Sequence, residues 1–188
     1  MTDYEIVVHG SSSREPEFVK SSDRFSYFSF DLSEFEYVDR LSDFIISEGI
    51  DIFINNAGIY SSNDPSGILL VNYVSPILVL EKIVPYLKEK SGCLININSL
   101  AGIYPNANEA KYCSTKFGMD GYIKSLQSDF SSPLHITQYY LGATKTDMTI
   151  GRPNYENLID PKEFSESLVR DLQEDSFVTV SKTIKRKK

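Results

Sequence analysis

The sequence predicts an α/β fold in which a parallel sheet carries helices on both faces, within one domain that spans residues 1–188. Short apolar runs rich in β-branched residues alternate with longer stretches whose apolar residues recur every three or four positions. Several of the short runs are almost continuously apolar, which is typical of strands buried on both faces. With 188 residues and 41% hydrophobic content, the chain has enough apolar material for one core.

The charge of the chain argues against nucleic acid as a partner. The net charge is -7 and the pI is near 4.9, whereas binding to a phosphate backbone requires a basic surface. The one basic cluster, residues 185–188, is typical of a solvated chain end.

The cysteines and the chain start indicate the compartment. Cys93 and Cys113 fit a reducing environment, and neither has metal-ligand spacing with His9 or His135. We see no secretory leader in residues 1–8 and no apolar run that reaches the length of a membrane span. We therefore expect a soluble cytoplasmic protein that binds neither membrane nor metal.

Two strands are predicted near the N-terminus. Residues 4–10 form an apolar run that ends in Gly10, and a loop over residues 11–16 follows. Residues 25–30 alternate aromatic and serine side chains and form the second strand. The segment between these strands has room for one short helix or loop.

A helix is predicted after the second strand. Ser33 and Glu36 have the spacing of a capping box, and Gly49 is a stop signal. The buried stripe of this helix is expected to contain Phe35, Val38, Leu41 and Ile45.

A central strand and a long helix come next. Residues 51–55 are apolar and β-branched, and Ala57 and Gly58 at their carboxyl end allow a ligand to approach the backbone. The helix over residues 66–90 contains Pro76, which removes the hydrogen-bond partner of the Asn72 carbonyl. We expect a kink there and a carbonyl free to hold a water molecule.

The C-terminal half continues the alternation of strands and helices. We expect a strand over 94–98 with Ser99 at its carboxyl end, a helix over 108–131 and strands over 135–141 and 177–184. Asp160 and Pro161 start the last helix, which buries one side. That side contains Phe164, Leu168 and Leu172.

Tyr112 and Lys116 form the most informative pair of residues. Their i to i+4 spacing places the phenol and the ammonium on one face of the helix. A nearby cation favours the phenolate, so we expect Lys116 to lower the pKa of Tyr112 toward values useful for proton transfer. Ser99 would hold the reacting oxygen. A tyrosine and a lysine at this spacing also occur as an ordinary solvated pair.

The order of these residues carries a resemblance to a known family. The series Asn55-Asn56-Ala57-Gly58, Asn72, Ser99, Tyr112, Lys116 resembles the short-chain dehydrogenase/reductase family, over residues from about 4 to 186. The resemblance implies a Rossmann-like doubly wound parallel sheet. The family normally opens with a strand and a Thr-Gly-x-x-x-Gly-x-Gly turn, which this sequence does not contain. The expected fold is therefore shortened at its N-terminus, with the first strand and helix missing.

Two alignments with the family are open at the N-terminus. In the first, residues 6–9 are the family's second strand, and the loop over residues 10–14 contacts the adenosine ribose. In the second, they are the first strand, and the loop is a phosphate loop that has lost its later glycines. We prefer the first, because the second requires a helix, a strand and another helix before residue 25.

The resemblance also implies a cofactor, NADP or NAD. Hydroxyl groups and Arg14 in the ribose loop suit the 2′-phosphate of NADP, although a solvated loop arginine explains them equally. Asp31 would bind the adenine amino group, or it starts the following helix. Thr146 would bind the nicotinamide amide, and Leu141 stands where the family has a proline. The full set of expected cofactor-binding residues is Arg14, Asp31, Leu32, Asn55, Ala57, Gly58, Tyr112, Lys116, Gly142 and Thr146.

The implied function is hydride transfer between NAD(P)(H) and a small carbonyl or alcohol substrate. The catalytic residues would be Asn72, Ser99, Tyr112 and Lys116, with Tyr112 as the general acid/base. The alternative is a non-catalytic remnant that serves as a binding or assembly module, because the pyrophosphate loses its backbone donors. A start of the natural chain further upstream is a third interpretation. Pairing through the helices of Asn72 and Tyr112 implies a homodimer or homotetramer.

The missing strand has a consequence for the sheet. In the family this strand lies in the middle, so its loss leaves either a gap or a direct pairing of residues 6–9 with 52–55. A gap would bury two rows of unpaired backbone groups, each at a cost of about 1 to 3 kcal/mol. We therefore expect the sheet to close up, or another chain to fill the place.

Overall fold

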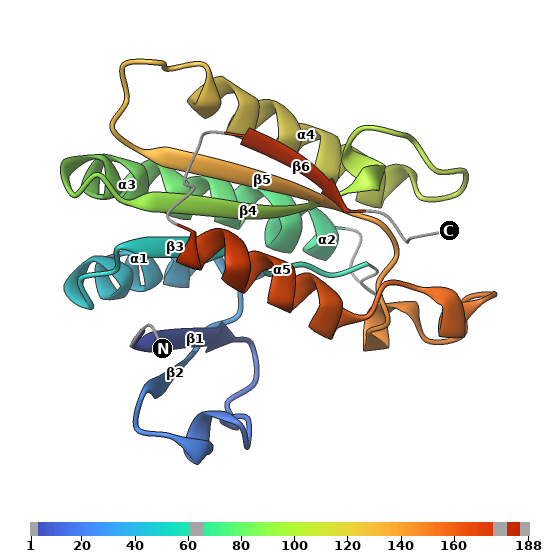
Figure 1. Cartoon of the computed structure of the whole chain (residues 1–188), viewed down its shortest axis with the longest axis horizontal. Coiled ribbons are helices and arrows are strands. Elements are labelled where there is room, and N and C mark those ends of the chain that lie inside the picture. The colour runs from blue at the N-terminus through green and yellow to red at the C-terminus, as the bar shows by residue number, and fades with distance from the viewer. Residues whose placement is uncertain (1–3, 61–65, 175–179, 185–188) are drawn as a thin grey trace.

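The computed structural model of the chain describes residues 4–60, 66–174 and 180–184. All its strand pairs are parallel, and they form two separate sheets (Figure 1). The first sheet pairs β1 (Ile6–Gly10) with β2 (Phe25–Ser29). The second has the order β3 (Ile52–Asn55), β4 (Cys93–Ser99), β5 (His135–Leu141) and β6 (Val180–Ile184). The predicted α/β class is confirmed.

The helices cover both faces of the larger sheet. In Figure 1, α5 crosses one face, and α3 and α4 lie on the other. The α-helices are α1 (Val38–Ser47), α2 (Gly67–Leu69), α3 (Ser75–Glu89), α4 (Ala110–Gln127) and α5 (Pro161–Gln173). Short 3-10 turns cover Val19–Ser21, Phe35–Tyr37, Leu100–Gly102, Asp147–Thr149 and Tyr155–Asn157.

The strand β4 is buried on both faces, as the sequence-based prediction of a buried strand over residues 94–98 requires. Leu94 joins a core cluster with residues of α1, α3 and α4, whereas Cys93 and Ile95 belong to a second cluster. Phe164 and Leu168 of α5 pack against that second cluster. The predicted apolar side of the last helix is thus confirmed, and the Asp160 side chain caps that helix by accepting from the Lys162 amide at 2.8 Å. The predicted last strand begins at Val180 in the described part, and residues 177–179 lie outside it.

Polar side chains connect three strands of the larger sheet. Asn55 donates to Asn96 at 2.7 Å, and Asn96 donates to Gln138 at 2.6 Å. Gln138 in turn donates to Asp120 of α4 at 3.0 Å. Asn96 and Gln138 are fully inaccessible to solvent, so this amide ladder lies inside the core.

The start of the helix after β2 differs from the sequence-based prediction. The prediction of a capping box at Ser33 and Glu36 is wrong. The carboxylate of Asp31 instead accepts hydrogen bonds from both the amide and the hydroxyl of Ser33, at 2.8 and 2.7 Å. This local turn engages the Ser33 amide, which a capping box would direct to the Glu36 side chain, and the Ser33 hydroxyl, which would accept from the Glu36 amide. A 3-10 turn follows, the α-helix begins only at Val38, and Phe35 is exposed rather than buried.

The long helix around Asn72 is irregular where the sequence predicts a kink. Leu70–Val74 is π-helical, between α2 and α3, and Pro76 lies at the start of α3. Together, Gly67–Glu89 makes 23 residues with a mean hydropathy of 1.7, so by length and composition it could cross a membrane. The prediction that no segment reaches that length is therefore wrong. Leu80, Ile83 and Leu87 are completely buried in the core, which accounts for its composition.

Of the two outcomes expected for the sheet, the direct pairing of residues 6–9 with 52–55 is wrong, whereas the filling of the gap by another chain stays a prediction. Within the described residues, β1 pairs with β2 and not with β3, as the first alignment requires. No residue of β1 or β3 is fully buried. The free edges are therefore not sealed from solvent, and the gap does not incur the full penalty for buried unpaired groups.

Candidate active site

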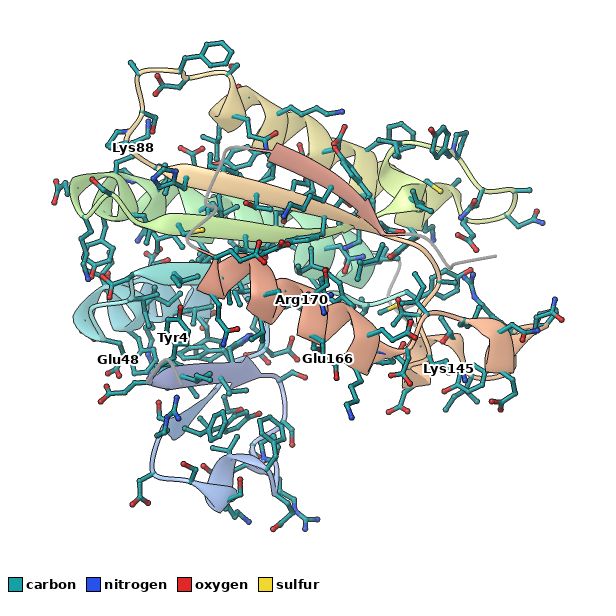
Figure 2. All side chains as sticks on the ribbon, in the orientation of Figure 1. Tyr4, Glu48, Lys88, Lys145, Glu166 and Arg170 are labelled. Atoms are coloured by element: carbon teal, nitrogen blue, oxygen red, sulfur yellow. The ribbon has the colours of Figure 1, made fainter. Side chains whose placement is uncertain are left out.

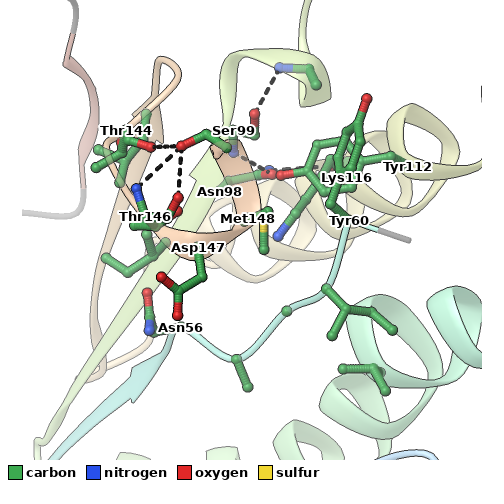
Figure 3. A pocket seen from close by; sticks show the side chains of 18 of the residues that line it. Asn56, Tyr60, Asn98, Ser99, Tyr112, Lys116, Thr144, Thr146, Asp147 and Met148 are labelled. Atoms are coloured by element: carbon green, nitrogen blue, oxygen red, sulfur yellow. Dashed lines mark hydrogen bonds between the residues drawn. The ribbon is translucent and has the colours of Figure 1, made fainter. Parts of the chain in front are cut away.

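A cavity of about 1190 Å³ lies at the carboxyl ends of β3, β4 and β5 (Figure 3). Ligands of open parallel sheets bind at this edge. Nine of the predicted site residues line the cavity: Asp31, Leu32, Ala57, Gly58, Ser99, Tyr112, Lys116, Gly142 and Thr146. Residues from five separate segments of the chain are thus brought to one place.

Ser99 is fixed at the point where β4 ends. Its hydroxyl accepts from the Ala101 amide at 3.1 Å, which starts the 3-10 turn, and its amide donates to the Asn98 side chain at 2.8 Å. Asn98 also donates to the carbonyl of Lys116 at 3.2 Å and so ties α4 to the end of β4. These contacts place the Ser99 hydroxyl against that of Tyr112, with which it forms a hydrogen bond.

Lys116 lies on the same face of α4 as Tyr112, as the spacing predicts. Its ammonium group is 5.7 Å from the centre of the Tyr112 ring. The residue is only 8% exposed, and this burial lowers its pKa to about 8. Lys116 therefore loses its proton more readily than an ordinary lysine.

The expected effect of Lys116 on Tyr112 is wrong in this structure. The pKa of Tyr112 is raised, chiefly because the hydroxyl is buried. The hydrogen bond with Ser99 and the charge of Arg152 act in the opposite direction, and the charge of Glu109 raises the pKa further. The ammonium of Lys116 lies over the ring rather than beside the hydroxyl, and this position does not offset the cost of burying a phenolate.

Asn72 supports the site but does not line the cavity. Its side chain accepts from the Ile59 amide and donates to the Ile59 carbonyl, both at 2.7 Å. A Cβ atom at Gly58 would lie 3.3 Å from the side-chain oxygen Oδ1 of Asn72 and 3.5 Å from the side-chain nitrogen Nζ of Lys116. Asn72 thus fixes the backbone that follows β3 close to Lys116.

Two other predicted residues are not brought to the cavity. Arg14 is exposed, and its guanidinium lies 3.8 Å from Glu17 on the surface. Asn55 is directed into the sheet, where it belongs to the amide ladder. Asp31 does line the cavity, and its bonds from Ser33 lower the pKa of its carboxyl group.

The loop after β5 is held by threonine side chains. Thr146 and Thr149 form a reciprocal capping box around the 3-10 turn, and the Thr149 hydroxyl donates to the Thr144 carbonyl at 2.6 Å. Thr144 in turn donates to the Gly142 carbonyl at 3.0 Å. These bonds give order to a loop in which Leu141 replaces the expected proline.

The sequence-based reasoning missed a charged cluster beside Tyr112. Glu109 accepts from the Tyr60 hydroxyl at 2.8 Å and from Arg152 at 2.9 Å. Arg152 lies 4.9 Å from the centre of the Tyr60 ring, and that ring lies 5.3 Å from the ring of Tyr112. Burial alone would raise the pKa of Glu109, but hydrogen bonds from Asn106 and Tyr60 and the charge of Arg152 lower it. Because the members come from three distant segments, no spacing in the sequence reveals the cluster.

Replacement of Gly102 by alanine is expected to destabilise the fold by about 1 to 3 kcal/mol, the usual cost of overpacking. A Cβ atom there would lie 2.8 Å from the Lys116 carbonyl and 3.0 Å from the Asn98 side chain. Gly121→Ala is the matched control, because a Cβ atom in that part of α4 meets nothing within 4 Å and alanine favours the helix. Urea denaturation of both variants measures the difference, and equal stability of the two would contradict the close packing at Gly102.

Comparisons with known proteins agree with this fold. A model of the short chain dehydrogenase family matches residues 3–156. A trans-4-hydroxycyclohexanecarboxylate dehydrogenase from Sinomonas cyclohexanicum is 28% identical over 111 residues, which cover 54% of this chain and 43% of the relative. The structure resembles that of 4-hydroxyisoleucine dehydrogenase complexed with NADH and succinate, with a TM-score of 0.79, 21% identity and coverage of 97% of this chain and 88% of that chain. It also resembles ElxO with NADP bound, with a TM-score of 0.79, 19% identity and coverage of 97% and 87%.

A parallel sheet with a tyrosine, a lysine and a serine at its carboxyl edge defines a class of oxidoreductases, and the chain belongs to the short-chain dehydrogenase family. The matched segments span 38% to 58% of the lengths of the curated relatives. Because the two solved structures above share only 21% and 19% sequence identity with this chain, they support the fold alone.

Proposed function

We propose that this chain is a nicotinamide-dependent oxidoreductase that acts on a small carbonyl or alcohol substrate. The observation that carries the proposal is the convergence of Ser99, Tyr112 and Lys116 in one cavity at the edge of the sheet. Tyr112 donates its proton to the carbonyl oxygen during reduction and accepts it during oxidation. Its raised pKa keeps the hydroxyl protonated at neutral pH, which suits the reductive direction.

The neighbours of Tyr112 have supporting roles in this proposal. Ser99, which is already hydrogen-bonded to Tyr112, holds the reacting oxygen. Lys116 binds hydroxyl groups of the nicotinamide ribose and supplies a positive charge near the cavity. The main-chain carbonyl of Asn72, within the π-helical segment, holds a water molecule that passes protons to solvent.

The residues that line the cavity fit a nicotinamide cofactor in part. The small residues Ala57, Gly58 and Gly142 leave room along the sheet edge, and Thr146 and Lys116 offer polar groups there. When bound, the cofactor supplies the hydride. We propose NADP rather than NAD, because the loop that follows β1 starts with serines, of which Ser11 lines the cavity, and has no acidic residue directly after the strand to accept a 2′-hydroxyl. Relatives in structure bind NADH or NADP, which supports a cofactor of this kind.

A binding or assembly module is the second candidate function. The printed sequence lacks the glycine-rich turn that would supply backbone donors to a pyrophosphate. In this second proposal the chain keeps the fold and the cavity but does not turn over substrate.

The isolated chain is expected to bind NADPH with a dissociation constant well above micromolar, because the backbone donors and the helix N-terminus for the pyrophosphate are missing. Titration by NADPH fluorescence measures the constant. Consumption of NADPH at millimolar concentration, followed by absorbance with a panel of small ketones, then tests the proposed reaction. A low-micromolar constant would contradict the expected weak binding and mean that residues 10–14 form a phosphate loop. The absence of consumption at any concentration would favour the binding module.

We also propose that the chain forms a homodimer or homotetramer through α4 and the long helix that contains Asn72, Gly67–Glu89. Leu69 and Phe117 are large apolar side chains that remain exposed on α2 and α4, which pack together in the monomer. Light scattering over a wide range of concentrations is expected to give a multiple of 21.3 kDa. A monomeric mass throughout that range would refute self-association.

A further inference from the structure

Arg152 is the second cation that lines the cavity, after Lys116, and the proposed chemistry leaves it without a role. Among the described residues, these two are the only lysine or arginine side chains in the cavity wall. Glu109, the partner of Arg152, precedes Tyr112 by three residues at the start of α4, whereas Lys116 follows Tyr112 by four. Along α4, the proposed proton donor therefore stands between a cation assigned to the cofactor and a cation with no assigned ligand.

Glu109 and Tyr60 fix the position of the Arg152 guanidinium group. Its Nη2 atom donates to Glu109 at 2.9 Å, and its Cζ atom lies 4.9 Å from the centre of the Tyr60 ring. Both oxygens of Glu109 have protein partners, because Oε1 also accepts from Tyr60 and Oε2 accepts from Asn106, each at 2.8 Å. The Glu109 side chain is only 13% exposed. Glu109 therefore orients the arginine and is itself satisfied by the protein.

The rest of the guanidinium group can be reached from the cavity. A guanidinium has five N–H donors in a rigid fork, and among the described residues the side chains that bond to this one are Glu109 and Tyr60. The Arg152 side chain is 34% exposed and lines the cavity. A fork held at one end by a carboxylate, and against an aromatic ring, is suited to bind a second planar carboxylate.

Arg152 is close enough to Tyr112 for one small molecule to reach both. The rings of Tyr60 and Tyr112 lie next to each other, with their centres 5.3 Å apart (Figure 3). The charge of Arg152 acts at the Tyr112 hydroxyl, where it lowers the pKa against the larger effect of burial. One helical turn rises about 5.4 Å, a span of roughly four carbon–carbon bonds. A carbonyl group at Tyr112 and a carboxylate at Arg152 therefore fit on one short carbon chain.

We propose that Arg152 is a specificity-determining residue and that the substrate is a short keto acid or the corresponding hydroxy acid. The carboxylate would bind the fork of Arg152 while the carbonyl group lies at Ser99 and Tyr112. Reduction then adds a hydride from the reduced cofactor to the carbonyl carbon and the Tyr112 proton to its oxygen, which gives the hydroxy acid. A singly charged carboxylate is favoured over a phosphate dianion, because Glu109 already shares the charge of Arg152. The inference rests on the proposed oxidoreductase function and adds a substrate class to it.

Reduction of matched substrate pairs tests the proposal. The pairs are 4-oxopentanoate with 4-oxopentanamide and 5-oxohexanoate with 5-oxohexanamide, which have the same shape and differ in charge. At a fixed millimolar concentration of NADPH, the parent chain is expected to favour an acid over its amide by about tenfold or more in kcat/KM, the usual effect of a hydrogen bond between charged groups. Arg152→Gln is expected to bring this ratio to one or below, chiefly because KM for the acid rises. Each ratio is taken within one variant, so a loss of folded protein cancels from it.

Two further variants separate direct contact from charge in the same loop. Lys145, shown in Figure 2, pairs with Glu156 at 3.4 Å and does not line the cavity. Lys145→Gln removes a cation near Arg152 in the sequence and is expected to keep the ratio of the parent chain. Arg152→Lys keeps the charge but not the planar fork, and it is expected to retain only part of the preference for the acid.

Several results would overturn the proposal. These are equal kcat/KM for acids and amides in the parent chain, an unchanged ratio in Arg152→Gln, or the same loss of preference in Lys145→Gln. Full preference for the acids in Arg152→Lys would overturn the contact through the fork.

Binding of 4-oxopentanoate without NADPH, measured by NMR titration, separates this inference from the proposed function. The dissociation constant is expected to rise at least tenfold in Arg152→Gln and to stay unchanged in Lys145→Gln. Such binding without turnover of any keto acid would support the carboxylate site and refute the oxidoreductase. Turnover of the amides as efficient as that of the acids would support the oxidoreductase and refute the role of Arg152.

Discussion

Replacement of Tyr112 by phenylalanine is expected to lower the rate of carbonyl reduction by about 10²- to 10⁴-fold, the usual contribution of a general acid. The phenylalanine ring keeps the packing of Tyr112 against Tyr60 and Lys116, and only the hydroxyl bonded to Ser99 is lost. The rate is measured by NADPH consumption at saturating cofactor. Circular dichroism and urea denaturation of the same variant are expected to show an intact fold.

The matched control for this variant is Tyr86→Phe. Tyr86 lies on α3 next to Lys90 and does not line the cavity, so its hydroxyl has no part in the proposed chemistry. Turnover equal to that of the parent chain is expected for this control. If Tyr112→Phe also retained full turnover, Tyr112 would not be the proton donor.

Replacement of Lys116 by methionine is expected to stabilise the fold at pH 7 by about 3 kcal/mol while it abolishes turnover. Burial lowers the pKa of Lys116 from 10.5 to about 8, so at pH 7 the folded chain carries a charge that is disfavoured where it lies. Methionine has a similar shape without the charge. A group with this cost is retained for a function and not for stability.

The difference in unfolding free energy between the parent chain and Lys116→Met is expected to depend on pH. Below about pH 8 both states of the parent chain are protonated at Lys116, and the full cost of the buried charge is present. Between about pH 8 and pH 10.5 the folded state releases the proton and the unfolded state keeps it, so the parent chain gains stability relative to Lys116→Met. Urea denaturation at pH 7 and pH 10 measures the change. The exposed Lys111→Met is the control, with no expected difference at either pH. A stability gap for Lys116→Met that stays constant with pH would contradict the lowered pKa.

Much of the fold follows from periodicity in the sequence. The strands β2, β4 and β5 lie within a residue or two of their predicted bounds, because short segments rich in β-branched and aromatic residues between turn signals are typical of strands. The pair of Tyr112 and Lys116 and the position of Ser99 follow from helix spacing and from the edge at which parallel strands end. These features depend on local sequence and on one rule of topology.

The features that the sequence did not predict depend on contacts between distant segments. Glu109 and Arg152 meet only because the loop after β5 folds back over the start of α4. The raised pKa of Tyr112 reflects how deeply the finished cavity buries its hydroxyl, which spacing along one helix does not determine. The gap beside β1 stays open because the residues of β1 are only half-buried. Their burial depends on how the helices and the two sheets pack together, which the local sequence does not determine.

The amide ladder across β3, β4 and β5 restricts how these strands can align. Asn55 lies directly opposite Asn96, and Asn96 lies directly opposite Gln138. A slip of one residue would turn Asn96 to the other face of the sheet and leave its partners unsatisfied in an apolar interior. The apolar residues of β4 alone would specify the register less strictly, because they lie on both faces of the sheet, with Leu94 on one face and Cys93 and Ile95 on the other. The ladder thus selects a single alignment for β3 and β4, and so it fixes the relative heights of Ser99 and of the Ala57–Gly58 backbone at the edge of the cavity.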